Sequence, residues 1–127
     1  MTRVALGVIV ALHGLVHLWF VVLALRWVEF QPDMGWTGRS WLLTPMIGDA
    51  ATRTVAAALL AIAAAAFVVG AGALIGQAPW WRPALVSAAI ISTAVLTVVW
   101  DGGTDMLVQK GVLGVVINAL VLIMAAR

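Results

Sequence analysis

The sequence contains no cysteine among its 127 residues, and only 9% of its residues are charged. The absence of cysteine excludes disulfide bonds, thiolate metal ligands and cysteine nucleophiles. The scarcity of charge, with a hydrophobic fraction of 65%, lies far outside the range of soluble globular proteins. The seven lysines and arginines are scattered singly, so no basic patch is present to contact nucleic acid. We expect a membrane protein, with the lipid bilayer as its partner and no nucleic acid partner.

Four apolar segments are long enough to cross a bilayer, and each is bounded by charge, proline or glycine. None shows the alternation typical of strands, and backbone groups in hydrocarbon must be bonded within the segment, so helices are predicted. The whole chain is expected to form one domain, an all-α integral membrane four-helix bundle with up-down-up-down topology. The predicted spans are residues 4–27, 51–76, 83–100 and 106–126.

The first apolar segment begins after Arg3, as a secretory signal does. It runs for about 24 residues, longer than the apolar part of a signal, so we expect a retained span. Asp49 is expected to cap the start of the second helix, and Pro83 suits the first turn of the third.

The first connection, from Val28 to Gly48, is longer than helix connections usually are. Its stretch "GWTGRSWLLTPMIG" is amphipathic, which predicts a short interfacial helix or a cap over the mouth of the bundle. The other two connections are short, so helices two, three and four should be antiparallel neighbours.

The tryptophans are placed as interfacial belts would be. One predicted belt contains Trp27, Trp36, Trp41 and Trp100, the other contains Trp80 and Trp81, and Trp19 lies deeper. The lysines and arginines are almost balanced between the two sides, and we favour termini on the cytoplasmic side.

Small residues recur at helical spacing in two of the predicted spans, where they permit close helix approach. The simplest interpretation is packing within the bundle, and self-association as a homo-oligomer is the alternative. One face carries Gly111, Gly114, Asn118, Leu122 and Ala125, and the other carries Ala57, Ala61 and Ala65.

Both histidines lie in the stretch "HGLVHLWF" of the first span. His13 and His17 are four residues apart and share one helix face, which we expect to point into the bundle. An ionisable side chain inside a membrane is a functional candidate by default. The alternative is purely structural, with each neutral ring hydrogen-bonded to Asn118 or to a Ser or Thr of a neighbouring helix.

The third span offers a matching stripe, in which Asp101, Thr97, Ala94, Ile90 and Ser87 follow one another at spacings of four and three. Asn118 should reach the level of His13. We therefore predict a polar cluster that lines a cavity, made of His13, His17, Thr97, Asp101 and Asn118.

The residues of this cavity limit the chemistry that it can perform. Two histidines on one helix cannot straddle a haem iron within one protomer. A metal held by His13 and His17 lacks the intervening glutamate of metalloproteases, so no metal site is assigned. No nucleophile and base pair is evident, so no catalytic residue or cofactor is assigned. A proton relay, or hydrogen bonding to a quinone or lipid-like ligand, needs only polar groups in an apolar cavity.

The motifs "HGLVHL", "SWLL", "WWRP" and "WD", with an asparagine in the fourth span, resemble a group of small bacterial four-span proteins. More distantly, the layout is similar to the DoxX-like membrane proteins. That resemblance implies a multi-pass protein of the bacterial cytoplasmic (inner) membrane with a redox or quinone-associated role. The absence of cysteine means that no thiol chemistry of such relatives carries over.

Three functions follow as hypotheses. The first is binding of a small lipophilic molecule, or a redox-accessory role, at the intramembrane polar cluster. The second is a structural or assembly subunit of a larger membrane complex. The third is a small oligomeric transporter, which is disfavoured because no Asp, Glu, Lys or Arg lies at mid-membrane.

Overall fold

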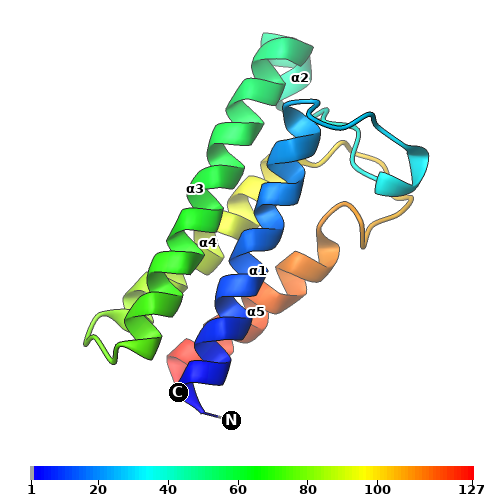
Figure 1. Ribbon diagram of the computed structural model, residues 1–127. Coiled ribbons are helices and arrows are strands. Elements are labelled where there is room, and N and C mark those ends of the chain that lie inside the picture. Colours follow the sequence, from blue (N-terminus) through cyan, green and yellow to red (C-terminus); the bar gives the residue numbers. More distant parts are fainter. Residues whose placement is uncertain (1) are drawn as a thin grey trace.

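The computed structural model describes residues 2–127, and this part of the chain is helical without strands (Figure 1). Three of the helices are long and apolar, and they pack together with a shorter apolar one into a helical bundle. The elements in order are α1 (Arg3–Ala24), the 3-10 turn η1 (Pro32–Met34), α2 (Leu43–Ile47), α3 (Asp49–Ile75), α4 (Trp81–Val99) and α5 (Val112–Ala126).

The most extensive helix contact is between α1 and α3, which approach closely because α1 presents glycine there. A Cβ atom at Gly14 would lie 2.5 Å from the Cβ of Phe67 and 3.2 Å from the carbonyl oxygen of Ala64. A Cβ atom at Gly7 would similarly meet the side chain of Ile75. Glycine on a helix surface thus lets the two backbones come together, which is how helices associate without a hydrophobic drive.

The chain then continues across the bundle, with α3 packed on α4 and α4 packed on α5. Gly70 of α3 lies against Leu85 of α4, and Arg82 at the start of α4 donates to the carbonyl oxygen of Ala125 at the end of α5. The two ends of the chain lie at the same end of the bundle (Figure 1). By contrast, α1 and α5 touch at few points.

The helix boundaries agree with the first three predicted spans to within a few residues, but the fourth helix is shorter than predicted. It begins at Val112 rather than near residue 106, because Lys110 turns inward and Gly111 adopts φ +104° as the N-cap. Its 15 residues extend about 22 Å, less than a hydrocarbon core of about 30 Å.

The first connection folds over the end of α4 and bonds the carbonyl groups that this helix leaves free. The carbonyl oxygens of residues 97 to 100 accept, in order, the Trp41 indole, the Ser40 hydroxyl, the Trp36 indole and the Trp41 backbone amide. The last carbonyls of a helix have no partner within it, so the connection supplies a complete cap. It is therefore largely a cap, with the short helix α2 beside it.

Trp36 departs from the predicted interfacial belt. Its ring is fully buried against Phe20, because its indole is committed to the end of α4, whereas Trp27, Trp41 and Trp80 are exposed.

Two other predictions about helix α3 are wrong. Ala61 and Ala65 are exposed rather than packed in the bundle, because the buried face of α3 runs through Leu60, Ala64 and Phe67. Asp49 is the first helical residue and not the N-cap, which is Gly48, and its carboxylate instead binds Arg26 and Arg53.

Candidate functional site

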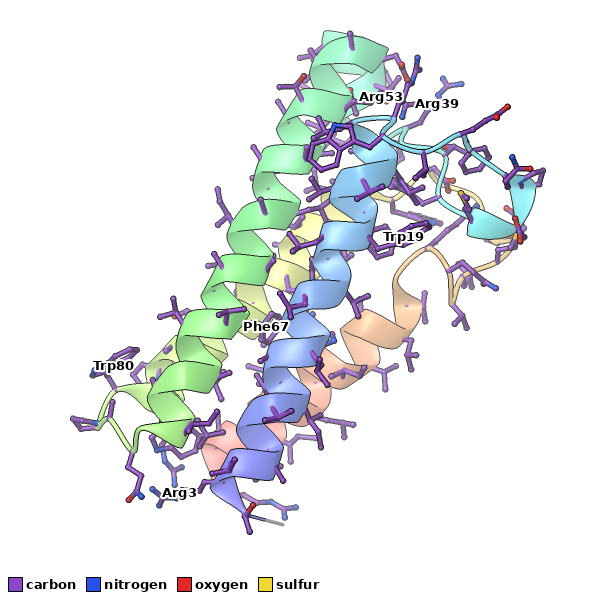
Figure 2. All side chains as sticks on the ribbon, in the orientation of Figure 1. Arg3, Trp19, Arg39, Arg53, Phe67 and Trp80 are labelled. Atoms are coloured by element: carbon purple, nitrogen blue, oxygen red, sulfur yellow. The ribbon has the colours of Figure 1, made fainter. Side chains whose placement is uncertain are left out.

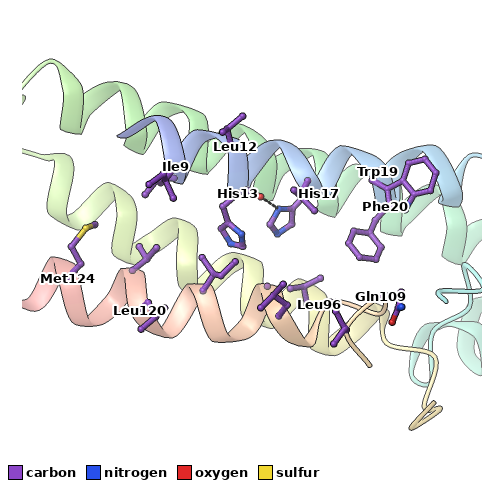
Figure 3. Close-up of a pocket in the computed structure, with 18 of the residues that line it drawn as sticks. Ile9, Leu12, His13, His17, Trp19, Phe20, Leu96, Gln109, Leu120 and Met124 are labelled. Carbon is purple, nitrogen blue, oxygen red and sulfur yellow. Dashed lines mark hydrogen bonds between the residues drawn. The ribbon is translucent and has the colours of Figure 1, made fainter. Parts of the chain in front are cut away.

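His13 and His17 lie inside the bundle, as their spacing predicts. Both side chains are buried, and their ring centroids are 5.5 Å apart. The ring of Phe67 from α3 packs edge-on against His13 at 4.8 Å. Figure 3 shows both rings pointing from α1 toward α4 and α5. The two imidazoles thus lie between α1 and the helices α3, α4 and α5.

Asn118 of α5 joins the histidines to α4. Its Oδ1 lies 2.8 Å from Nε2 of His13, and its Nδ2 donates to the hydroxyl oxygens of Ser92 at 2.9 Å and Thr93 at 3.0 Å. The Ser92 hydroxyl in turn lies 2.7 Å from Nε2 of His17. We call these five residues the polar cluster: His13, His17, Ser92, Thr93 and Asn118.

The polar cluster is a continuous hydrogen-bond network in an otherwise apolar interior. Asn118 and Ser92 are fully buried, and every solvent-inaccessible side-chain nitrogen or oxygen within residues 2–127 has a hydrogen-bond partner. Buried polar groups are tolerated when they are bonded, and between apolar helices such bonds hold helices together. The network therefore ties α1, α4 and α5 at one level.

Thr97 and Asp101 do not belong to the polar cluster, which corrects the predicted site. Thr97 is exposed on the outer face of α4, where its hydroxyl donates to the carbonyl oxygen of Thr93. Asp101 follows the end of α4 and binds Lys110. The predicted stripe failed because α4 is rotated so that Ala88, Ser92 and Val99, not residues 87, 90, 94 and 97, face the bundle.

The sequence contained a signal for Ser92. Ala88, Ala89 and Ser92 form a run of small residues at spacings of one and three, and small residues mark the close-packed face of a membrane helix. The opposite face carries Ile90 and Thr97 but also the small residues Ser87 and Ala94, so residue size separates the two faces only weakly. The adjacent pair Ala88 and Ala89 close to Ser92 is the local hint of the observed face.

A second, charged cluster lies just beyond the end of α4. The ammonium of Lys110 is 3.1 Å from Asp101 and 2.9 Å from Asp105, and the Lys110 and Asp101 side chains are only 3% and 6% exposed. The hydrogen bond from Lys110 lowers the pKa of Asp105, and the same bond raises the pKa of Lys110. Buried charges require such pairing, so this cluster fixes the connection before α5.

A groove of about 980 Å³ separates α1 from α5 (Figure 3). Its walls are mainly aliphatic side chains of the two helices, including Ile9, Val16 and Leu120, and His13 and His17 contribute to its lining. Met34 of the first connection and Gln109 of the connection between α4 and α5 line it as well. Its volume is that of a pocket for a drug-sized ligand. Such pockets are usually lined by apolar side chains with a small number of polar groups.

The polar side chains that line this groove are His13 and His17 on α1 and Asp33 and Gln109 in the connections, so its chemistry is hydrogen bonding. Within residues 2–127, no group of three or more His, Cys, Asp or Glu side chains is placed to hold a metal ion. The charged residues gather toward the two ends of the bundle, with Arg39 and Arg53 at one end and Arg3 at the other (Figure 2). The groove thus suits an uncharged apolar molecule with a polar head.

Comparison with known proteins identifies no relative. No protein-family model matches the chain, and no curated protein or solved structure is significantly similar to it.

Proposed function

We propose that this protein is an integral membrane protein that binds a small lipophilic molecule, quinone-like or lipid-like, in the groove between α1 and α5. The observation that carries this proposal is the groove itself, an apolar space of about 980 Å³ with His13 and His17 in its lining. An apolar cavity with a few oriented polar groups is the usual form of a small-molecule site. A redox-accessory role is the form of this function in which the ligand is a quinone.

The membrane setting is supported by helix length and exposed surface. Helices α1, α3 and α4 contain 22, 27 and 19 residues and are strongly apolar, long enough to cross a bilayer. Large aliphatic side chains such as Val16, Ile62 and Leu120 are exposed along the bundle. We propose four spans of alternating direction, with the bilayer thinned around the shorter α5 and the pair Lys110–Asp101 at the interface outside the span.

The compartment and orientation belong to the same proposal. We place the chain in a bacterial cytoplasmic membrane with both termini on the cytoplasmic side. Reporter fusions at the C-terminus test this, since a reporter active only in the cytoplasm should work there and a reporter active only after export should not.

The lateral position of the groove fits a ligand that arrives from the bilayer. Leu12 and Val16 on the α1 side and Leu113 and Leu120 on the α5 side are all about half exposed, so the rim of the groove is itself apolar. A lipophilic molecule could move from hydrocarbon into this groove without crossing water.

The test is to fill the groove and measure bound lipophile. Val16→Trp places an indole in the groove, and Val69→Trp is the matched control, because both valines are 56% exposed but Val69 of α3 does not line the groove. Native mass spectrometry of protein extracted in mild detergent measures co-purifying species and copy number together. We expect a bound lipophile in the wild type and in Val69→Trp, and its loss in Val16→Trp. No bound species in the wild type, or equal retention in both variants, would refute the proposal.

A role as an assembly subunit is the second candidate, and one observation favours it. The outer face of α3 carries exposed small residues, Ala58, Ala61, Ala65 and Gly72, and a side chain added at Gly72 would meet nothing within 4 Å. Small residues on an exposed face allow another helix to approach closely. The same mass spectra separate the two candidates, because assembly predicts a mass above one chain without a small ligand.

A further inference from the structure

The hydrogen-bond network fixes which ring nitrogen of His17 carries a proton. Its Nδ1 lies 3.1 Å from the carbonyl oxygen of Gly14 and 3.3 Å from that of His13. Carbonyl oxygens only accept, so Nδ1 must be the protonated nitrogen. A charged ring is costly among apolar helices, so His17 is neutral and its Nε2 accepts. The Ser92 hydroxyl at 2.7 Å therefore donates its one proton to Nε2 of His17.

The direction of the remaining bonds follows from Ser92. Since its proton is committed to His17, Ser92 accepts from Nδ2 of Asn118, whose second proton goes to Thr93. The Asn118 Oδ1 is then the atom that faces His13, at 2.8 Å from Nε2. An amide oxygen accepts, so Nε2 of His13 carries the proton. The two histidines are thus opposite tautomers.

This assignment leaves His13 with one uncommitted acceptor. In neutral His13 the Nδ1 atom has a lone pair, and among residues 2–127 no side chain or backbone group donates to it. Every solvent-inaccessible polar side-chain atom in this part of the chain has a hydrogen-bond partner. Since Nδ1 of His13 has none, it is accessible from the surface. His13 lines the groove, and the other histidine in that lining, His17, has both of its nitrogens bonded.

We propose that the lipophile in the groove presents a hydroxyl group as a hydrogen-bond donor to Nδ1 of His13. This inference rests on the proposed function and names the chemical class of its ligand. A hydroquinone or a lipid alcohol such as diacylglycerol has such a group, whereas a quinone carbonyl, an ether or an ester can only accept. An acceptor head would face the lone pair of Nδ1, so the site selects the reduced, hydroxylated form of a quinone-type ligand.

The binding test uses ligands that differ only in the donor. A decyl-tailed hydroquinone, kept reduced, is compared with its dimethyl ether and with the oxidised quinone, and diacylglycerol is compared with its O-methyl ether. Affinities are measured by native mass spectrometry titration of the intact chain in mild detergent. We expect the hydroxyl form to bind about three- to tenfold more tightly in at least one series, the value of one net hydrogen bond, and the series that shows it identifies the source of the head group.

The variant test removes the acceptor. In the double variant His13→Phe with Asn118→Leu, both partners of the internal bond are replaced, so neither of them is left unpaired; Ser92 keeps its bond to His17, and Thr93 loses the amide donor. We expect this variant to bind the hydroxyl and ether forms equally. The matched control is Thr97→Val on the outer face of α4, in which the preference should be unchanged.

A spectroscopic readout keeps the inference testable if the double variant does not fold. In wild-type protein labelled with ¹⁵N-histidine, His13 should show Nε2–H and His17 should show Nδ1–H, and hydroquinone should shift only Nδ1 of His13. Protonated Nδ1 on His13, or equal or tighter binding of the ether and quinone forms, would overturn the inference. If the ether and quinone forms bound at least as tightly as the hydroxyl form and Val16→Trp still abolished their binding, the groove would remain the binding site. Only the inference that the ligand donates a hydroxyl group would then be wrong.

Discussion

The two sides of α1 are joined to the bundle by different means. Toward α3, the helix presents Gly7 and Gly14, and the contact is close and apolar. Toward α4 and α5 it presents His13 and His17, which reach their partners through hydrogen bonds and leave a groove beside them. Close packing leaves no room for a ligand, whereas a polar network can hold helices together across a wider space. One helix therefore combines a close-packed side with a hydrogen-bonded side that borders a groove.

The largest expected effect comes from breaking the polar side. Asn118→Leu keeps the branching and the number of side-chain heavy atoms but removes bonds to His13, Ser92 and Thr93. Interhelical bonds in membranes are worth ~0.6 to ~1.7 kcal/mol each, so we expect a loss of about 2–4 kcal/mol in unfolding free energy. Denaturation in detergent measures it. A loss as small as that of the control Thr97→Val would show that the network does not hold α5.

A smaller effect is expected on the close-packed side. Gly14→Ala places a methyl group 2.5 Å from the Cβ of Phe67, and overpacking of this kind costs about 1–3 kcal/mol. Gly72→Ala gains the same helix propensity on α3 but meets nothing within 4 Å. We expect the first variant to melt at a lower temperature than the wild type and the second to melt at an equal or higher one. Equal melting temperatures would mean that the α1–α3 contact is not close.

The next effect in size concerns the cap on the end of α4. Trp36→Phe removes the indole donor to the carbonyl oxygens of Val99 and Arg39, for an expected loss of about 1–2 kcal/mol. Trp27→Phe is the control, since that ring is 69% exposed. Thermal unfolding compares the two. The idea of a structural cap fails if both substitutions have the same effect.

The smallest effect concerns pH and the charged cluster. The pKa of Asp105 is lowered in the fold, so its contribution to stability is present above the unfolded value of ~3.9 and is lost as pH falls through the lowered pKa. The pKa of Lys110 is raised, so its contribution is present below ~10.4 and is lost as pH rises through the raised pKa.

Stability should accordingly be flat from about pH 5 to about pH 9 and fall at both extremes. Asp105→Asn should flatten the acid limb and also reduce the alkaline limb, since the hydrogen bond to Asp105 is the largest cause of the raised pKa of Lys110. Melting temperatures measured across pH provide the check, with exposed Glu29→Gln as control. An acid limb unchanged by Asp105→Asn would assign it to another carboxyl group.

Much of the fold follows from simple rules of helix length and composition. The three long helices and the inward direction of His13 and His17 were predicted, because hydrocarbon thickness and the helical repeat fix them. Asn118 was correctly named as a possible partner of the histidines. These features depend on local sequence alone.

The rotation of α4 and the start of α5 could not be obtained in the same way. Both faces of a membrane helix are apolar, so hydropathy does not tell the lipid side from the protein side. The stripe that ends at Asp101 therefore predicts Thr97, whereas the fold uses Ser92. The late start of α5 depends on the contact of Lys110 with Asp101 inside the irregular connection between α4 and α5, which helical periodicity does not describe. The groove depends on how far α1 stands from α5, which no local pattern encodes.

The most direct test of the groove uses the absence of cysteine, since a single introduced cysteine is the only label site. A nitroxide is placed at Leu120→Cys on the α5 rim, or at Ile62→Cys on α3, which has similar exposure but lies outside the groove. The protein in bilayers is then titrated with the decyl-tailed hydroquinone while label mobility and oxygen collision are recorded. The account predicts a fall in both at position 120 and none at 62; no change at 120, or equal change at both, would contradict it.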